Sequence, residues 1–103
     1  MSGWIHAREI VEEQSVSGAV DEYSKQYARF DKVYLALTWL LARRCHNLPG
    51  RRPREVDGVQ YYLYKMQGDP MADTPDIVIL YTFNDQQVNI IAVEAQERDE
   101  NSE

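Results

Sequence analysis

The last quarter of the chain contains two apolar segments that predict a β-hairpin. They run from Asp76 to Phe83 (DIVILYTF) and from Gln87 to Ala95 (QVNIIAVEA), and the polar turn Asn84-Asp85-Gln86 joins them. β-Branched and aromatic residues dominate both segments, and such residues are typical of strands. The chain is therefore expected to form a sheet, and its other segments must cover that sheet.

The first of these strands is apolar on both of its faces. Val78 and Leu80 share one face, and the opposite face carries Ile77, Ile79, Tyr81 and Phe83. Strands of this kind are usually central in their sheet, because only there are both faces covered. We therefore expect the hairpin at the middle of the sheet.

A helical pattern precedes the hairpin. From about Ser17, apolar side chains recur at spacings of three and four residues, which is typical of amphipathic helices. The residues concerned are Val20, Tyr23, Tyr27, Phe30, Val33, Leu37, Leu40 and Leu41. The sequence Asn47-Leu48-Pro49-Gly50 ends the pattern, because proline and glycine do not continue a helix.

The number of helices in this segment stays open. No Pro or Gly occurs between Ala19 and Pro49, so residues 17–45 form either one long helix or two. In the second case Asp31 is the candidate N-cap of the second helix. Trp39, near the centre of the pattern, is expected in the core.

The remaining segments complete a small sheet in one domain. Residues 59–66 (VQYYLYKM) favour a strand, a basic, proline-containing loop precedes them at 49–58, and 1–14 is either a short edge strand or an irregular arm. The predicted class is α+β, with a small antiparallel sheet and an N-terminal helical hairpin packed on one face. We expect one domain over residues 1–96, followed by an acidic tail, 97–103, that frays.

Charge is distributed unevenly along the chain. The net charge of −6 opposes general nucleic-acid binding, because such binding requires cations that neutralise phosphate. Five of the eleven basic residues nevertheless fall within twelve residues that contain no acid: Arg43, Arg44, Arg51, Arg52 and Arg54. This basic segment is the first candidate binding site, for phosphate or for an acidic protein surface.

The sequence lacks the motifs of several common catalytic and cofactor-binding sites. The chain has no glycine-rich phosphate loop, nucleophile elbow or dinucleotide fingerprint. Its one cysteine, Cys45, forms no intrachain disulfide, and its two histidines, His6 and His46, are too few for a metal site. We expect no cofactor and no metal. The longest nearly apolar run, 33–42, is too short to cross a bilayer and no signal peptide is visible, so a cytoplasmic location is expected.

Three stretches of the chain resemble the RelE/ParE superfamily of bacterial toxins. They are FDKVYLALTWLLARRCHNLP (30–49), GVQYYLYKM (58–66) and PDIVILYTFNDQQVNIIAVEAQER (75–98). The last is similar to the C-terminal hairpin of that family, in which a strand with an internal tyrosine is followed by a short polar turn containing Asp and a second apolar strand. The resemblance implies a small antiparallel sheet with a two-helix hairpin packed on it.

The resemblance also implies activities and a partner. RelE-like members cut mRNA on the ribosome, ParE-like members inhibit DNA gyrase, and both are usually encoded beside an antitoxin that wraps the toxin. An RNA cutter needs cations that hold phosphate and a group that moves the 2′-hydroxyl proton. The candidate binding residues are Arg43, Arg44, Arg51, Arg52, Arg54, Lys65 and Arg98, and the candidate proton-transfer residues are His46 and Tyr81.

The chain departs from the RNA-cutting members within the hairpin. Those members tend to carry a basic residue where this chain has Val78, and basic residues near the end of the last strand, where this chain has Glu94. They are also usually basic overall, whereas this chain is acidic. We therefore predict a toxin-family protein of bacterial or phage origin that acts by binding a protein, either an antitoxin or a cellular target such as gyrase or the ribosome.

Two alternatives stay open. One is an active ribonuclease with RNA as its substrate, although the net charge disfavours it. The other is a small acidic inhibitor or immunity-type protein that mimics nucleic acid. Convergence of the loop arginines with Lys65 and His46 in one cleft favours the enzyme, arginines spread over an apolar groove favour protein binding, and a continuous acidic face favours the mimic. The oligomeric state is open as well, a dimer included.

Overall fold

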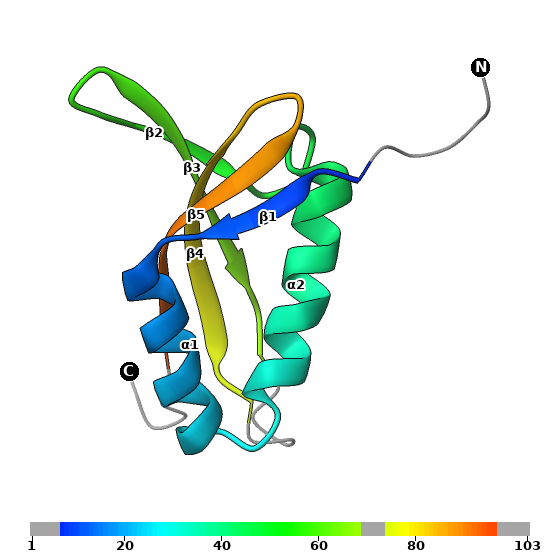
Figure 1. The fold of residues 1–103 in the computed structure, drawn as a ribbon, viewed down its shortest axis with the longest axis vertical. Coiled ribbons are helices and arrows are strands. Elements are labelled where there is room, and N and C mark those ends of the chain that lie inside the picture. The colour runs from blue at the N-terminus through cyan, green and yellow to red at the C-terminus, as the bar shows by residue number, and fades with distance from the viewer. Residues whose placement is uncertain (1–6, 69–73, 97–103) are drawn as a thin grey trace.

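Two helices and a five-stranded sheet make up the part of the protein that the computed structural model describes, residues 7–68 and 74–96 (Figure 1). The expected α+β class is confirmed. The elements in chain order are β1 (Glu9–Glu12), α1 (Gln14–Gln26), α2 (Phe30–Arg44), β2 (Arg52–Val56), β3 (Val59–Met66), β4 (Asp76–Phe83) and β5 (Gln87–Gln96).

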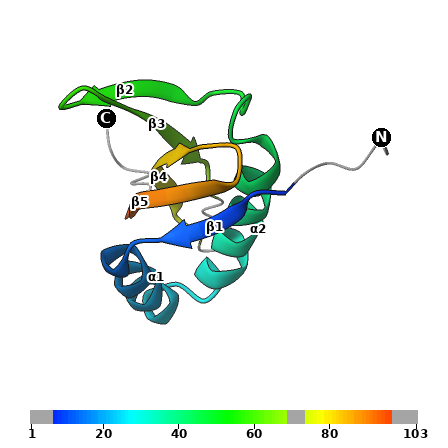
Figure 2. The same ribbon diagram turned by 45° about the horizontal axis from the view of Figure 1, so that its top comes forward.

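The sheet has the strand order β1-β5-β4-β3-β2. Strands β2 to β5 pair antiparallel in succession, whereas β1 joins β5 in parallel, so the sheet is mixed and not purely antiparallel as expected. Both helices lie on the same side of this sheet (Figure 2). The molecule is therefore a two-layer structure, with one sheet face covered by helices and the other left open.

The predicted hairpin is confirmed, and its second strand is one residue longer than expected. β4 and β5 occupy the interior of the sheet, and their turn is Asn84-Asp85-Gln86. The side-chain Oδ1 of Asn84 accepts hydrogen bonds from the backbone N–H groups of Gln86 and Gln87, at 2.7 and 2.9 Å. This local arrangement explains why asparagine starts the turn, since its side chain replaces a backbone acceptor.

The helical segment is divided into two helices. α1 ends before Tyr27, whose backbone is extended (φ −123°, ψ 123°) and whose side chain is buried. α2 begins at Phe30, so Asp31 lies in its first turn rather than at the N-cap, and its carboxylate accepts the backbone N–H of Lys32. The buried Tyr27 therefore lies at the break between the helices, which neither proline nor glycine marks in the sequence.

The core lies between the helices and one face of the sheet. One side of α2 supplies Phe30, Tyr34, Leu37 and Leu41, and the sheet supplies Ile77, Ile79, Tyr81, Val88 and Ile90. The Tyr81 hydroxyl donates a 2.9 Å hydrogen bond to the backbone oxygen of Cys45, just beyond the end of α2. The central strand and the second helix are thus joined by a buried polar contact as well as by packing.

Two further expectations about the fold are wrong. Trp39 is 57% exposed, because two helical residues turn by about 200° and place it opposite the buried Leu37. The basic loop at 49–58 is largely a hairpin: its first strand is β2, and Asp57 and Gly58 form the turn with positive φ angles of 52° and 80°. An Asp-Gly pair with such angles is typical of two-residue hairpin turns. Pro53 is tolerated in β2 because β2 is an edge strand.

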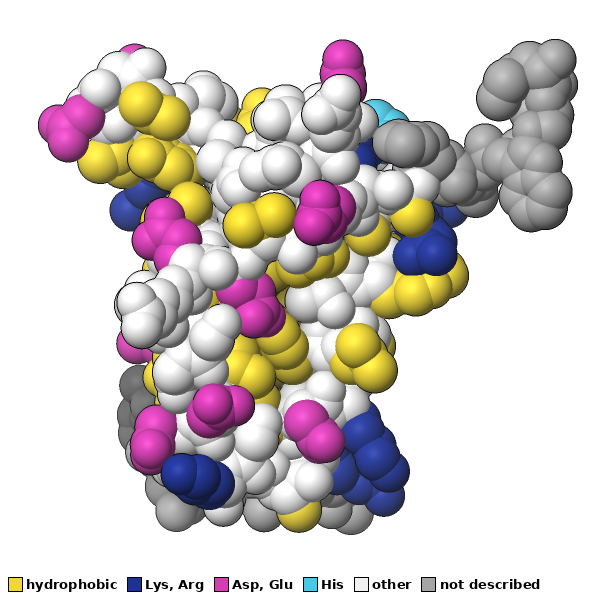
Figure 3. Space-filling view, in the orientation of Figure 1, with side chains coloured by type: hydrophobic (Ala, Val, Ile, Leu, Met, Phe, Trp, Pro, Cys, Tyr) yellow, Lys and Arg dark blue, Asp and Glu magenta, His cyan; other side chains and the backbone are white. Residues whose placement is uncertain are grey.

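A groove opens between the two helices beside β1. Its volume is about 500 Å³, and its lining is Ile10, Glu12, Ser17, Val20, Asp31, Tyr34, Leu35 and Thr38. Figure 3 shows apolar side chains in the hollow between α1 and α2, with acidic side chains around it. The Glu12 carboxylate is held there by the hydroxyls of Tyr34 and Ser17, at 2.5 and 3.0 Å.

Candidate functional site on the open face of the sheet

The open face of the sheet gathers three of the predicted binding residues. Arg52 pairs across strands with Leu63, Arg54 pairs with Tyr61, and Lys65 pairs with Val78. Residues that face each other in antiparallel strands point to the same side of the sheet. Since the neighbouring residues of β4 are buried against the helices, these side chains lie on the face that the helices do not cover.

An apolar floor lies between these charges. Leu63, Val78 and Leu80 come from the central strands β3 and β4 and are half-buried. A cleft of about 400 Å³ opens over part of this floor and is lined by Gly50, Arg52, Leu63, Lys65, Val78 and Gln96. We name this region, Arg52, Arg54, Leu63, Lys65, Val78 and Leu80, the open-face site.

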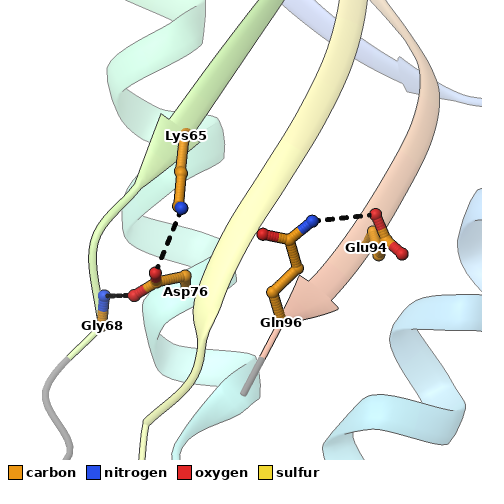
Figure 4. A network of polar contacts seen from close by, with 5 residues as sticks. All are labelled: Lys65, Gly68, Asp76, Glu94 and Gln96. Atoms are coloured by element: carbon orange, nitrogen blue, oxygen red, sulfur yellow. Dashed lines mark hydrogen bonds and ion pairs between the residues drawn. The ribbon is translucent and has the colours of Figure 1, made fainter. Parts of the chain in front are cut away.

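Lys65 is tied to an acid at the edge of the open-face site (Figure 4). Its ammonium lies 3.5 Å from a carboxylate oxygen of Asp76, whose side chain is only 10% exposed. The other carboxylate oxygen of Asp76 accepts the backbone N–H of Gly68 at 2.7 Å. The positive charge of Lys65 is therefore partly balanced within the protein, and less of it is available to a phosphate.

A second acid lies on the same face. Glu94 pairs with Val78 across β5 and β4, and its carboxylate accepts a 3.2 Å hydrogen bond from the Gln96 side chain. This is the position at which the resemblance to RNA-cutting toxins predicts cations. The open face consequently carries both signs of charge around an apolar floor.

Arg51 is directed to the other side of the sheet. Its guanidinium donates a 2.7 Å hydrogen bond to the backbone oxygen of Cys45 and lies 4.4 Å from the centre of the Tyr62 ring. Tyr62 packs against the core. Arg51 and Arg52 are adjacent in sequence, yet Arg51 joins the end of α2 to the sheet, whereas Arg52 belongs to the open-face site.

The arginines of α2 lie apart from both the open-face site and Arg51. The Arg43 guanidinium stacks 4.1 Å from the centre of the Trp39 ring, and a cleft of about 370 Å³ is lined by Trp39, Arg43, Arg44, His46 and Asn47. His46 therefore lines a different cleft from Lys65. Arg98, the remaining predicted binding residue, lies outside the described residues.

Tyr81 is placed for packing. Its side chain has no exposed surface, and its hydroxyl is bonded to the Cys45 backbone. Burial raises the pKa of Tyr81 to about 12, against the opposing effect of Arg51. Burial also raises the pKa of the Cys45 thiol, which keeps the thiol protonated at neutral pH. His46 and Tyr81 do not meet in one cleft as a pair of proton-transfer groups.

Sequence reasoning missed Asp76, which lies beside the open-face site, and the exposed Leu35, which lies on α2. Asp76 holds Lys65 and the backbone of Gly68, and it is one of the few buried polar residues. Its position at the start of an apolar strand gave no sign of this role. Leu35 is 69% exposed on α2, and a helical projection would have placed it, with Trp39, opposite the buried stripe.

Residues 7–68 and 74–96 contain no group of three His, Cys, Asp or Glu side chains that could hold a metal ion. Over the same ranges, no helix has the length and apolar character needed to cross a membrane. No family model, curated protein or solved structure matches the chain.

Proposed function

We propose that this chain is a RelE/ParE-like protein that acts by binding a partner protein through the open-face site. The observation that carries the proposal is the composition of that site, in which Arg52 and Arg54 border the apolar floor that neither helix covers. Apolar surface rimmed by charged residues is typical of protein-binding sites. The chemistry suits a partner segment that places apolar side chains on the floor and a carboxylate beside the arginines.

The charge of the site favours a protein over a nucleic acid. Lys65 is paired with Asp76, and Glu94 lies across from Val78. Phosphate binding depends on uncompensated cations, and the chain as a whole carries a net charge of −6. A protein segment with both apolar and acidic side chains fits this mixed surface better than a polyphosphate backbone does.

The arrangement of the candidate catalytic residues points the same way. His46 lines the cleft beside Trp39, Lys65 lines the cleft on the sheet, and Tyr81 is buried. General acid–base catalysis requires these groups within reach of one substrate atom. The order of helices and strands is compatible with the family proposal, whose partners are an antitoxin or a cellular target.

Charge reversal of the open-face site tests the proposal. The double variant Arg52→Glu with Arg54→Glu should lose capture of the protein encoded beside this chain, measured by co-expression and affinity purification. The control is Arg44→Glu, which alters an exposed arginine at the end of α2 and should leave capture unchanged. Thermal stability of both variants should stay near that of the original chain. Unaltered capture by the double variant would contradict the proposal.

Induction in a bacterial host separates the proposal from ribonuclease activity. We expect transcripts to stay intact after induction, because the candidate proton-transfer groups are not assembled. Sequencing of RNA 5′ ends measures this directly. New cleavage ends that disappear in a His46→Ala variant would establish the ribonuclease instead.

A further inference from the structure

The outer face of α2 carries a ridge of four residues at intervals of four. Asp31, Leu35, Trp39 and Arg43 follow one another along the helix, from the groove between α1 and α2, which Asp31 and Leu35 line, to the side opposite the buried Leu37 at Trp39. Leu35 and Trp39 are 69% and 57% exposed, the two highest values among the large hydrophobic side chains of the described residues. Large apolar side chains that are exposed together on one face often mark a site of contact with another protein.

The ridge has an order of charges that is complementary to itself. Its N-terminal end is acidic at Asp31, its middle is apolar, and its C-terminal end is basic at Arg43. When a second copy of α2 is laid alongside in the opposite direction, each acidic end meets a basic end. When the two-fold axis passes at the level of residue 37, position 35 of one copy faces position 39 of the other. Leu35 and Trp39 are therefore brought together as well.

We propose that two copies of this chain form a two-fold symmetric dimer through antiparallel contact of their α2 ridges. Asp31 of each copy then faces Arg43 of the other, and Leu35 of each copy contacts Trp39 of the other. Contacts between rows of residues spaced by four are the commonest way in which helices pack. A two-fold interface requires such a self-complementary surface.

The groove beside the ridge supplies a second feature that fits this occupant. The groove between α1 and α2 is lined by the apolar side chains of Leu35, Ile10 and Val20 and by the acidic residues Glu12 and Asp31. A Trp39 side chain from the second copy brings with it the Arg43 guanidinium, which is stacked on the indole 4.1 Å from its centre. An aromatic ring that carries a cation is complementary to a groove whose lining combines apolar side chains with carboxylates.

The geometry of Arg43 favours this contact because the side chain is already ordered. Besides the stacking on Trp39, its guanidinium donates a 3.3 Å hydrogen bond to the Trp39 backbone oxygen. Less conformational entropy is then lost on association. One helix from each copy still makes a small interface, so we expect a dimer that dissociates on dilution.

Charge reversal followed by mixing tests the dimer. Sedimentation velocity over rising concentrations should show a monomer–dimer equilibrium for the original chain. Asp31→Arg and Arg43→Asp should each weaken self-association at least tenfold, because each variant places like charges opposite each other. An equimolar mixture of the two variants should recover the dimer, since every charged pair is then of opposite sign.

Two further variants make the result specific to the ridge. Glu22→Arg reverses an exposed charge on α1, outside the ridge, and should leave self-association unchanged. Trp39→Ala should abolish it, with circular dichroism unchanged because the ring is exposed. A chain that stays monomeric at every concentration would overturn the proposal, and the ridge would then be a candidate contact site for a different protein. Failure of the mixture to recover the dimer would overturn it as well.

Discussion

The two faces of strand β4 are alike in sequence and different in use. Ile77, Ile79 and Tyr81 have no exposed surface, because α1 and α2 cover that side of the sheet. Val78 and Leu80, on the other side, are only half-buried. A strand that is apolar on both faces therefore does not imply two covered faces. In this protein the helices cover one face of the strand and leave the other face open.

Truncation of one side chain from each face gives the largest expected contrast. Ile79→Ala should lower the free energy of unfolding by about 2–5 kcal/mol, because it opens a cavity in the core. Leu80→Ala should lower it by roughly 1 kcal/mol or less, since that side chain is already partly in water. Urea unfolding measures both values. Equal losses would show that the open face is as well packed as the other.

Alkaline pH should weaken the helix-covered face. The folded state raises the pKa of Tyr81 from 10.0 to about 12, and it raises the pKa of Tyr34 through burial and the hydrogen bond to Glu12. Above pH 10 the unfolded chain releases these protons while the folded chain keeps them, so stability falls as pH rises. The expected slope is about 1.4 kcal/mol per pH unit for each group. Tyr81→Phe should reduce the slope between pH 10 and 12, and an unchanged slope would contradict this assignment.

The two acids near the open face should differ in their effect on stability. Asp76→Ala removes both the ion pair with Lys65 and the acceptor for the Gly68 N–H, at a cost of about 1–3 kcal/mol. Glu94→Ala removes an exposed carboxylate and should change stability by about 0.5 kcal/mol or less. Thermal unfolding at pH 7 distinguishes the two. A larger loss for Glu94→Ala than for Asp76→Ala would contradict the stabilising role of the Asp76 contacts.

Adjacent arginines provide the smallest contrast in stability and the sharpest in binding. Arg51→Ala should cost about 1–2 kcal/mol, because its hydrogen bond to Cys45 and its contact with Tyr62 join the helix to the sheet. Arg52→Ala should change stability by less than about 0.5 kcal/mol and should instead weaken partner binding. Calorimetric unfolding and partner binding should be measured on both variants. A larger loss of stability for Arg52→Ala than for Arg51→Ala would contradict these roles.

The strands with strong patterns could be predicted from the sequence. β3 and β4 have the predicted bounds, and the β4–β5 turn lies at the predicted polar residues 84–86. β2 was missed because all its residues are exposed and one is proline, so it has no hydrophobic pattern. The Asp57-Gly58 pair was the available signal for that hairpin.

Side-chain direction could not be predicted where it depends on tertiary structure. The basic segment is continuous in sequence, but its arginines point in different directions. Arg43 stacks on Trp39 of α2, Arg51 contacts the end of α2 on the helix-covered side of the sheet, and Arg52 lies on the open face. The place of Trp39 near the centre of the helical pattern predicts a core residue, whereas its angular position on α2 leaves it 57% exposed. A sequence motif thus predicted a binding site of five arginines, and the fold retains two of them beside the apolar floor.

Crosslinking from the open face tests the central claim most directly. A photoreactive benzoylphenylalanine at position 63, in place of Leu63, should form one discrete adduct with a host or co-expressed protein on irradiation in cells. The same group at position 28, in place of the exposed Ala28 between the helices, should form none. The adduct should disappear when Arg52→Glu and Arg54→Glu are added. An absence of adduct at position 63, or an adduct that survives this charge reversal, would contradict a protein-binding role for the open face.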